Sequence, residues 1–461
     1  MADKKTSGFK TFLLIFITII LAFVFGCAAY LMLVPSSSLF GLKYASNTGK
    51  ITYEYTDANK TQLLRLSDYS KIIVNANNGK GHTHVKINAG AVSGMTNSQI
   101  VLSKNTKGYM KIGAQTQYAL SCTPSGSTLT INIQEPEYNF LKIANNTVLS
   151  INLYSASDNL IGTHFEINTG SGNVTIGGQV ITTESAKSLT FGSANITTKS
   201  GSVSVNSVAT ITGELNVKST TGTIRINGNK SFSSLSLETN TGKILTDDLT
   251  TNLSLKSFNS RVSLGNITGN VEFEMTSGIL EMGNVTGKLL SDNKIKYTTV
   301  KAGKISGAVT LINAKDGNFS VNIKETVGDV AIRSGNKTIK IGKAYGKTEI
   351  ETVGGTIDIA KADTNFNNMF LTTKSGLVLA KYNMVCGNNT ITTTSGAVKI
   401  KFGTTAHFML TASSEKGKVY RVWLEDKTNH LNNVAVGDYE ISTNFVTIST
   451  TSGNVRLEQV K

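Results

Sequence analysis

Apolar and polar residues alternate in short runs that recur along most of the chain. In the clearest copy, apolar residues stand seven and five positions before Gly278 (Val271 and Phe273) and two and four positions after it (Leu280 and Met282). Alternation with a period of two is typical of strands that bury one face. The pattern therefore predicts two short strands that meet at a corner beside Gly278.

The same frame, with the glycine as position zero, fits repeatedly from about residue 165 to the end of the chain. The predicted corner glycines are Gly172, Gly201, Gly222, Gly242, Gly278, Gly317, Gly355, Gly376, Gly396 and Gly453. Ser260 and Lys337 take position zero in two further copies, and one copy is degenerate around Asn293. We expect glycine at these corners because it adopts the positive φ that other residues resist.

Most neighbouring zero positions are 18 to 21 residues apart, which is the period of a solenoid and too long for a hairpin. One such unit cannot close a core alone, but stacked units bury a continuous apolar column. The sequence therefore predicts an all-β fold, a single parallel β-solenoid (β-helix) over residues 165–461. An insertion at about 402–444 interrupts it and holds the one tryptophan, Trp423.

The start of the chain differs from the rest. Residues 1–10 hold three lysines, and residues 11–34 carry no charge over 24 positions. Because about 20 apolar residues suffice to cross a bilayer, this predicts a cytoplasmic basic tail followed by a transmembrane signal anchor. Lysines before the anchor predict a single-pass protein of the cell membrane, with its N-terminus inside and its body extracellular. A cleaved signal peptide, or a lipoprotein processed at Cys27, stays open as an alternative.

Between the predicted anchor and the regular coils lie two segments of different character. Residues 35–50 form a short tether, and residues 51–164 contain strands in an irregular frame. A solenoid needs an atypical end that covers its open core, so we interpret 51–164 as an N-terminal β cap with irregular first coils. Cys122 and Cys386 lie far apart in this body, and we expect no disulfide between them.

The recurring Thr-Ser-Gly-x-Val-x-Ile pattern, behind one N-terminal apolar segment, resembles a bacterial family of β-strand repeats. That family is the "putative adhesin" β-strand-repeat family, relatives of the head domains of auto-transporter-type adhesins. The resemblance covers about residues 70–461 and rests on many weak copies of the repeat. It implies a parallel β-solenoid on the cell surface and supplies no catalytic residues. Some anchored relatives resemble envelope-stress components.

Parallel β-helices also include polysaccharide lyases and hydrolases, whose sites need acids and bases stacked on consecutive coils. The outward position three after zero reads Thr175, Ser204, Arg225, Leu245, Ser263, Glu281, Ser320, Lys340, Asp358, Leu379, Lys399 and Arg456. No pair of acids is stacked there, and Asp247, Asp248 and Asp292 are isolated. His82 and His84 share one face of a strand but have no third ligand nearby. We therefore predict no enzyme, no cofactor and no metal site.

The net charge of +15 is the remaining feature. A basic surface attracts anionic polymers, and a rod with a repeating face offers many equivalent weak contacts. The sequence thus favours an adhesin-like binding or structural module that contacts anionic cell-wall or host polysaccharide. The alternative is an envelope-stress or structural subunit whose partner is an envelope protein, and a Lys-rich surface also serves simply to keep long sheets soluble. Nucleic acid is not expected, because the chain offers no platform of aromatic side chains for stacking bases.

Overall fold

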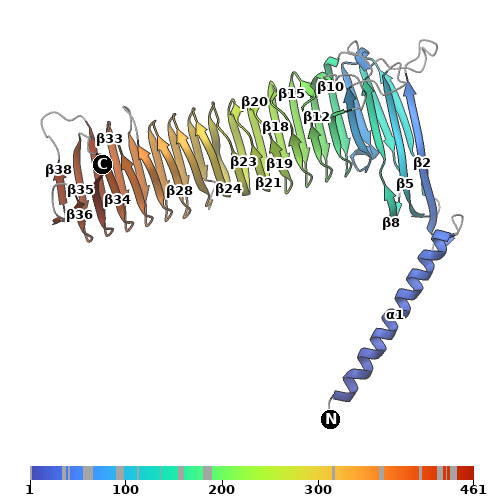
Figure 1. Ribbon diagram of the computed structural model, residues 1–461, viewed down its shortest axis with the longest axis horizontal. Helices are drawn as coiled ribbons and strands as arrows, with labels where there is room; N and C mark the ends of the chain where they lie inside the picture. Colours follow the sequence, from blue (N-terminus) through green and yellow to red (C-terminus); the bar gives the residue numbers. More distant parts are fainter. Residues whose placement is uncertain are drawn as a thin grey trace.

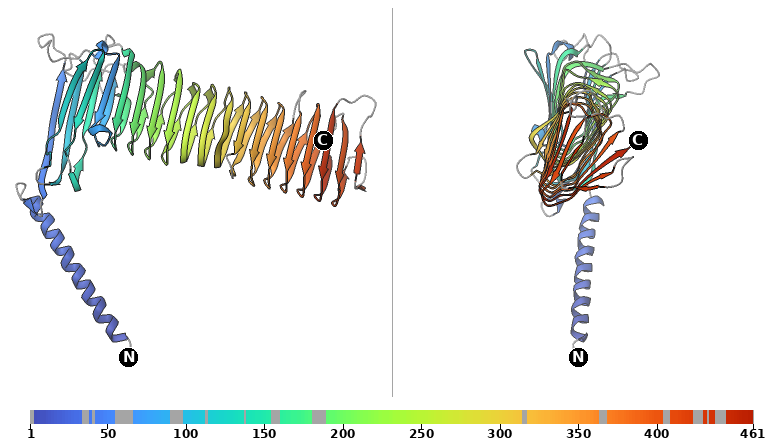
Figure 2. Two further views of the ribbon diagram at one scale, coloured as in Figure 1. Left: turned by 180° about the vertical axis from the view of Figure 1, so that it is seen from behind. Right: turned by 90° about the vertical axis from the view of Figure 1, so that its left-hand side faces the viewer.

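The computed structural model is a long β-rod with one helix projecting from its N-terminal end (Figure 1). The structure describes residues 3–33, 38–39, 42–54, 66–89, 98–111, 114–136, 138–153, 160–179, 189–313, 317–362, 368–403, 408–422, 429–431, 433–436 and 444–460. Strands stack side by side along the whole rod, and the view down its length shows a flattened, closed cross-section (Figure 2). Every coil is therefore one layer of a single elongated body.

Two rows of strands run along the rod, one on each side of the predicted corner. The first row comprises β7 (Thr128–Gln134), β3 (Lys71–Ala76), β10 (Leu160–Thr169), β12 (Leu189–Thr198), β15 (Glu214–Ser219), β18 (Ser234–Thr239), the first parts of β21 (Leu253–Leu264), β23 (Val271–Met282) and β24 (Leu289–Ile305), then β25 (Val309–Asn313), β27 (Val330–Ser334), β29 (Thr348–Thr352), β31 (Met369–Thr373), β33 (Asn388–Thr393), β39 (Phe445–Thr450) and β35 (Met409–Ser414). The second row comprises β9 (Val148–Leu153), β4 (His84–Ala89), β11 (Val174–Gln179), β13 (Val203–Val205), β16 (Ile224–Ile226), β19 (Lys243–Thr246), the last parts of β21, β23 and β24, then β26 (Ser320–Thr326), β28 (Ile339–Ala344), β30 (Ile357–Ala362), β32 (Val378–Tyr382), β34 (Val398–Gly403), β40 (Val455–Val460) and β36 (Val419–Val422).

Within each row every strand pairs in parallel with the strand of the next coil. Ile224 pairs with Ile244, for example, and Ile244 pairs with Val262 in turn. Short third-row strands, β14 (Ala209–Ile211), β17 (Lys230–Ser231), β20 (Leu249–Thr250) and β22 (Ile267–Thr268), complete several coils. Parallel pairing of successive coils makes the fold a β-solenoid-like stack, which confirms the all-β prediction at that level.

The alternation found in the sequence is the inside and outside of this stack. Val271, Phe273 and Leu280 are all at most 1% exposed, and Met282 is also buried. Val271, Leu280 and Met282 pair in register with apolar residues of both neighbouring coils, so these side chains stack along the rod. Phe273 pairs with Leu255 on one side and lies at a register shift on the other. The core is therefore a continuous column, and its stability depends on the number of stacked coils.

The corner glycines form a second column, and the physical reason differs from the predicted one. In the nine that stack, a Cβ atom would lie 1.9 to 2.0 Å from a backbone carbonyl oxygen of the preceding coil. Only Gly278 of these nine has a positive φ, at +117°. The prediction that positive φ requires glycine here is therefore wrong for the other eight. At these nine positions glycine fits because the backbone of the preceding coil approaches too closely for a Cβ atom. The coils centred on Ser260, Thr298, Phe319 and Lys337 carry a side chain at position zero.

Gly317 does not belong to this column. Val321 pairs with Val300 on one side and with Ile339 on the other, which places Phe319, two residues earlier, at position zero. Thr298 pairs with Gly278, so the degenerate copy is centred on Thr298. Asn293 instead lies where the register of β24 shifts, and it has a positive φ of 54°. In each case the strand register shifts locally, and the spacing of apolar residues in the sequence did not show that shift.

At both ends of the rod the coils are stacked out of sequence order. Strand β3 lies between β7 and β10, and β39 lies between β33 and β35. Thus the first and last coils of the chain are each held between two other coils. Antiparallel strands cover the outside: β5 (Gln99–Lys111) pairs with β9, and β38 (Asn433–Val436) pairs with β35. Trp423, in the predicted insertion, lies outside the described residues.

Buried Glu135 closes the corner column at the N-terminal end. Its carboxylate accepts hydrogen bonds from the backbone N–H groups of His82 (2.8 Å) and Thr83 (2.7 Å) and from the Thr83 hydroxyl (2.6 Å). In later coils the corner N–H groups reach the carbonyl groups of the preceding coil, as Gly170 does with Gly81. Glu135 supplies the acceptors that no preceding corner provides.

Helix α1 (Asp3–Leu33) precedes the rod and leaves apolar side chains such as Phe12 and Leu14 exposed. A membrane span needs about 20 consecutive, predominantly apolar residues in one helix. In the described part of the chain, no helix meets the requirements of length and apolar character for crossing a membrane. The prediction of a single-pass anchor at residues 11–34, with the body outside the membrane, is therefore wrong.

Candidate binding site

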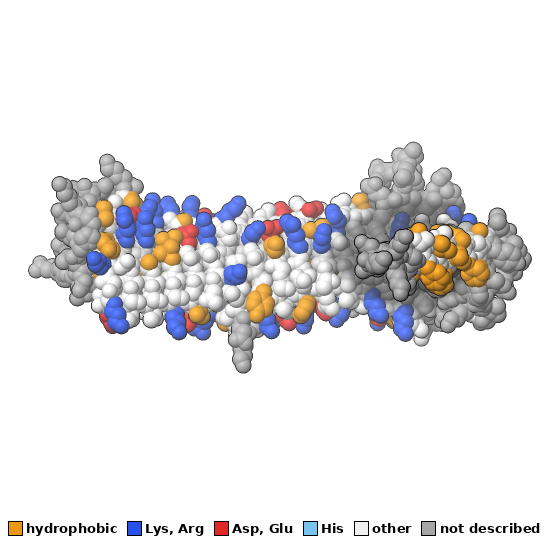
Figure 3. Space-filling view, turned by 90° about the horizontal axis from the view of Figure 1, so that it is seen from below, with side chains coloured by type: hydrophobic (Ala, Val, Ile, Leu, Met, Phe, Trp, Pro, Cys, Tyr) orange, Lys and Arg blue, Asp and Glu red, His pale blue; other side chains and the backbone are white. Residues whose placement is uncertain are grey.

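Charged side chains on the outer face of the rod are arranged as ion pairs between neighbouring coils. Glu281 accepts from Lys301 at 2.7 Å and from Arg261 at 3.4 Å, which joins three coils. Further pairs between described residues are Lys71–Glu166, Lys218–Glu238, Lys256–Glu274, Lys294–Glu272, Lys304–Glu325, Lys343–Glu325, Arg333–Glu349 and Arg333–Glu351. Along the middle of the rod, acidic side chains on neighbouring coils thus neutralise much of the basic charge. Figure 3 shows Lys and Arg side chains in rows along the edges of one face, with acidic side chains among them.

The C-terminal coils differ, because several cations there share one acid. On β34 and β40, Glu458 lies 3.3 Å from Lys399, 3.9 Å from Lys401 and in contact with Arg456. Lys381 on β32 pairs in register with Lys401 on the next coil. We call Lys381, Lys399, Lys401 and Arg456 the basic patch. It has four cations and one carboxylate on three stacked strands.

The surface beside the basic patch is slightly hollowed. Lys381, Lys399 and Lys401 line this shallow depression together with Asp358 and Leu379. Asp358 is held by Lys340 of the preceding coil, at 3.8 Å. Ile359, Ala360 and Ala380 also line the depression, and the side chains of Lys399 and Lys401 remain partly exposed to solvent.

Glu458 is the least exposed member of the cluster, with 14% of its side chain accessible. Burial raises the pKa of Glu458, but hydrogen bonds from Arg456 and Lys399 outweigh it and hold the pKa below its usual range. The carboxylate is therefore ionised at neutral pH, and it positions Arg456 and Lys399 without neutralising the whole patch.

The sequence revealed half of this patch. Lys399 and Arg456 stand three positions after their corner glycines, where the outward residues were compared. Lys381, Lys401 and Glu458 stand five positions after zero, on the same outer face. The signal was present in the sequence, since strands turn every second residue outward. Only the stacking order showed that β40, rather than β36, follows β34 directly.

The other sequence candidates are held in structural contacts. His84 accepts a hydrogen bond at Nδ1 from the Asn173 backbone, at 2.9 Å, and His82 Nδ1 contacts the Ser171 hydroxyl. Asp248 accepts from the Asn266 backbone at 2.7 Å. Among the described residues, no group of three or more His, Cys, Asp or Glu side chains could hold a metal ion. The prediction that this chain is not an enzyme stays a prediction.

A repeated motif that the sequence analysis did not single out supports seven of the corners. A buried Thr or Ser stands three positions before the glycine, and its hydroxyl accepts the glycine N–H: the distance is 3.0 Å for Thr373 and Gly376, and 2.9 Å for Thr450 and Gly453. The same bond occurs in the coils of Gly172, Gly201, Gly222, Gly242 and Gly417. A [Thr/Ser]-x-x-Gly spacing would have been the sequence signal.

Comparison with known families extends this picture of repeated coils. The profile of the Toastrack DUF4097 family matches residues 44–360 and, overlapping them, 280–458. The chain belongs to the Toastrack DUF4097 family. In this Toastrack chain the matched residues include almost every strand of the rod. The relation to auto-transporter-type adhesin heads stays a prediction.

Two further comparisons add no function to the Toastrack assignment. The chain matches no curated protein. A solved structure described as a "putative cell adhesion protein" from Clostridium sporogenes is similar at 8% sequence identity, covering 90% of this chain and 100% of the other, with a TM-score of 0.15. At that TM-score the likeness supports no argument about this chain.

Proposed function

We propose that the rod is a binding module for anionic polymers and that the basic patch is its principal contact. The observation that carries the proposal is the imbalance of charge on β32, β34 and β40, where four cations surround the single carboxylate of Glu458. Along the middle of the rod, many outer-face cations instead stand beside acids of neighbouring coils. An anionic chain would gain most by lying across the C-terminal coils.

The spacing of the patch suits a polymer better than a small anion. Strands of adjacent coils lie about 4.8 Å apart, so cations on three strands present charge over about 10 Å along the rod axis. Repeated anionic groups on one chain could contact several cations at once, and linked contacts bind more tightly than separate ones. Acidic cell-wall or host polysaccharides are the first candidates, bound without cleavage.

The test is binding of a defined polyanion to the full chain and to a patch variant. We expect the triple variant Lys381→Gln, Lys399→Gln, Lys401→Gln to bind long-chain polyphosphate at least about tenfold more weakly at low salt, because three charge contacts are lost. Binding by the unaltered chain should also weaken steeply between low and high salt. Fluorescence anisotropy of labelled polymer would measure both effects.

A matched control separates the patch from net charge. The variant Lys256→Gln, Lys294→Gln, Lys304→Gln also lowers the net charge from +15 to +12, but it removes lysines that pair with Glu274, Glu272 and Glu325. We expect this control to bind polyphosphate nearly as well as the unaltered chain. Equal losses in the two variants, or no retention at low salt, would overturn the proposal and leave a structural role with a protein partner.

A further inference from the structure

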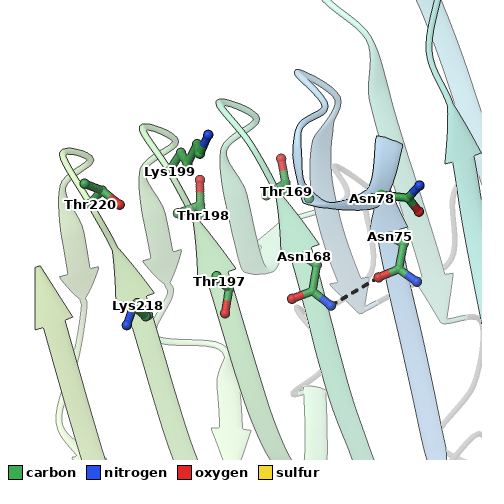
Figure 4. Close-up of a pocket in the computed structure, with 10 residues that line it drawn as sticks. Asn75, Asn78, Asn168, Thr169, Thr197, Thr198, Lys199, Lys218 and Thr220 are labelled. Atoms are coloured by element: carbon green, nitrogen blue, oxygen red, sulfur yellow. Dashed lines mark hydrogen bonds between the residues drawn. The ribbon is translucent and has the colours of Figure 1, made fainter.

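A polar groove lies at the opposite end of the rod from the basic patch. It is formed where the outer face of β3, β10, β12 and β15 meets the corner turns, and its volume is about 430 Å³. Volumes of about 300 to 1,000 Å³ are typical of ligand sites. The groove crosses four stacked strands, as Figure 4 shows. A ligand lying in it would extend along the rod axis.

The floor of the groove carries amide and hydroxyl groups in one row. Asn75, Asn168, Thr197 and Lys218 follow each other in register on successive coils. The Asn75 amide donates to the Asn132 oxygen at 3.2 Å, and the Asn168 amide donates to the Asn75 oxygen at 3.1 Å. Both amides thus donate toward the N-terminal end of the rod, and Asn75 also accepts from the coil on its C-terminal side.

This amide ladder ends inside the groove. The residue that follows Asn168 in register is Thr197, which cannot continue a chain of amide groups. In Figure 4 the oxygen of Asn168 points away from Asn75, toward the Thr197 side of the groove. An acceptor oxygen and a nearby exposed hydroxyl therefore face the open space. Such a pair is suited to hydrogen bonds with ligand hydroxyl groups.

Two lysines and a turn with a constrained backbone border the polar floor of the groove. Lys199 and Lys218 line the groove. Its described lining residues include no acidic side chain, but Glu166, which is paired with Lys71, accepts a hydrogen bond from the Asn168 amide at 3.2 Å. Lys218 also pairs with Glu238 on the next coil, at 2.8 Å, which holds its ammonium group close by. On the far side Asn78 and Gly79 form a turn in which Asn78 has a positive φ of 52°. Strained backbone of this kind tends to be kept where it shapes a site.

We infer that this groove binds an acidic saccharide, with sugar hydroxyls on Asn168 and Thr197 and an anionic substituent on Lys199 and Lys218. The neutral side chains of Asn168 and Thr197 would form hydrogen bonds with the sugar hydroxyls, and the two lysines would bind a negatively charged group. The basic patch lacks such neutral groups, so it recognises charge alone. This assignment is independent of the basic patch and gives the rod a second, chemically more selective contact.

The test uses the full chain carrying the triple patch substitution, so that the remaining binding reports on the groove. The probes are a uronic acid hexasaccharide, a neutral hexasaccharide and a short polyphosphate of equal charge. Isothermal titration calorimetry should show saturable binding of the uronic acid oligomer, with weaker or no binding of the other two. In that background, Asn168→Asp should lower affinity by tenfold or more, because a carboxylate replaces the neutral amide beside the acidic ligand.

Matched variants locate the effect within the groove. Lys218→Gln should weaken binding several-fold, whereas Lys256→Gln should not, although Lys256 occupies the same register position two coils further on and also pairs with an acid, Glu274. Asn216→Ala, which removes an amide ladder contact to Asn195 outside the groove, is a second control. Binding that is absent at millimolar ligand, unchanged in Asn168→Asp, or equally strong for polyphosphate would overturn the inference.

Discussion

The corner column and the outer face belong to the same coils but are built under opposite constraints. At the corner, backbones of successive coils approach so closely that a Cβ on Gly376 would lie 1.9 Å from the Gly355 carbonyl oxygen. On the outer face, the same strand positions hold Lys, Glu, Thr or Asn from one coil to the next. The corner therefore limits which residues allow coils to stack, whereas the outer face tolerates different polar side chains from coil to coil.

The difference also shows where charge can be used for recognition. Many outer-face charges in the middle of the rod form ion pairs between neighbouring coils. One example is Lys256–Glu274, in which both side chains are well exposed. Exposed pairs contribute roughly 0 to 1 kcal/mol to stability. We therefore expect substitutions at the corner to change the free energy of unfolding, and those on the outer face to change binding.

The largest expected effect is at the glycine column. Gly376→Ala should lower the free energy of unfolding by about 3 kcal/mol or more, because the new methyl group overlaps a backbone carbonyl that cannot move without shifting the coil. Urea unfolding followed by circular dichroism would measure it. Gly162→Ala is the control, since nothing lies within 4 Å of its added Cβ. Similar losses in both variants would contradict the close-approach explanation.

A smaller effect is expected from the hydroxyl that supports the corner. Thr373→Val should cost about 1 to 3 kcal/mol, because the buried N–H of Gly376 loses its acceptor while side-chain volume is kept. Thr372→Val, next to it on the exposed face of β31, should be close to neutral. Chemical unfolding of the two variants compares the two faces of one strand directly. Equal effects would show that the hydroxyl bond does not stabilise the corner.

The smallest expected effect is the titration of two histidines near the N-terminal coils. Burial, with Lys86 and Lys71 respectively, lowers the pKa of His84 and of His164 below the ordinary value of 6.5. Both contribute stability that is fully present above about pH 6.5 and is lost as pH falls through the folded pKa values, since the unfolded chain takes up protons first. Thermal unfolding between pH 7.5 and pH 5 should show a modest loss.

The double variant His84→Asn, His164→Asn should lose less stability over the same interval of about 2.5 pH units. Protonation of His84 at Nδ1 would also break the bond from the Asn173 N–H, which links that histidine to the next coil. A loss of the same size in the double variant would assign the pH dependence to other groups, such as the carboxylates.

The sequence by itself determined the repeat, the two strands of each coil and the identity of the buried side chains. Val271, Phe273 and Leu280 could be assigned to the core from spacing alone, because a strand alternates its faces with a period of two. Nine of the ten glycines predicted in this way lie in the column, and the same frame found two of the four cations in the basic patch. These features depend on residues close together along the chain.

Only the tertiary structure decided which coils are neighbours and what each neighbour requires. The insertion of β39 between β33 and β35, the capping of the N-terminal corner by Glu135, and the meeting of Asn75 with Asn168 all join residues more than 35 positions apart. The glycine positions were visible in the sequence, but their cause was not. Close approach of two backbones is a property of the stack, and a single coil contains no sign of it.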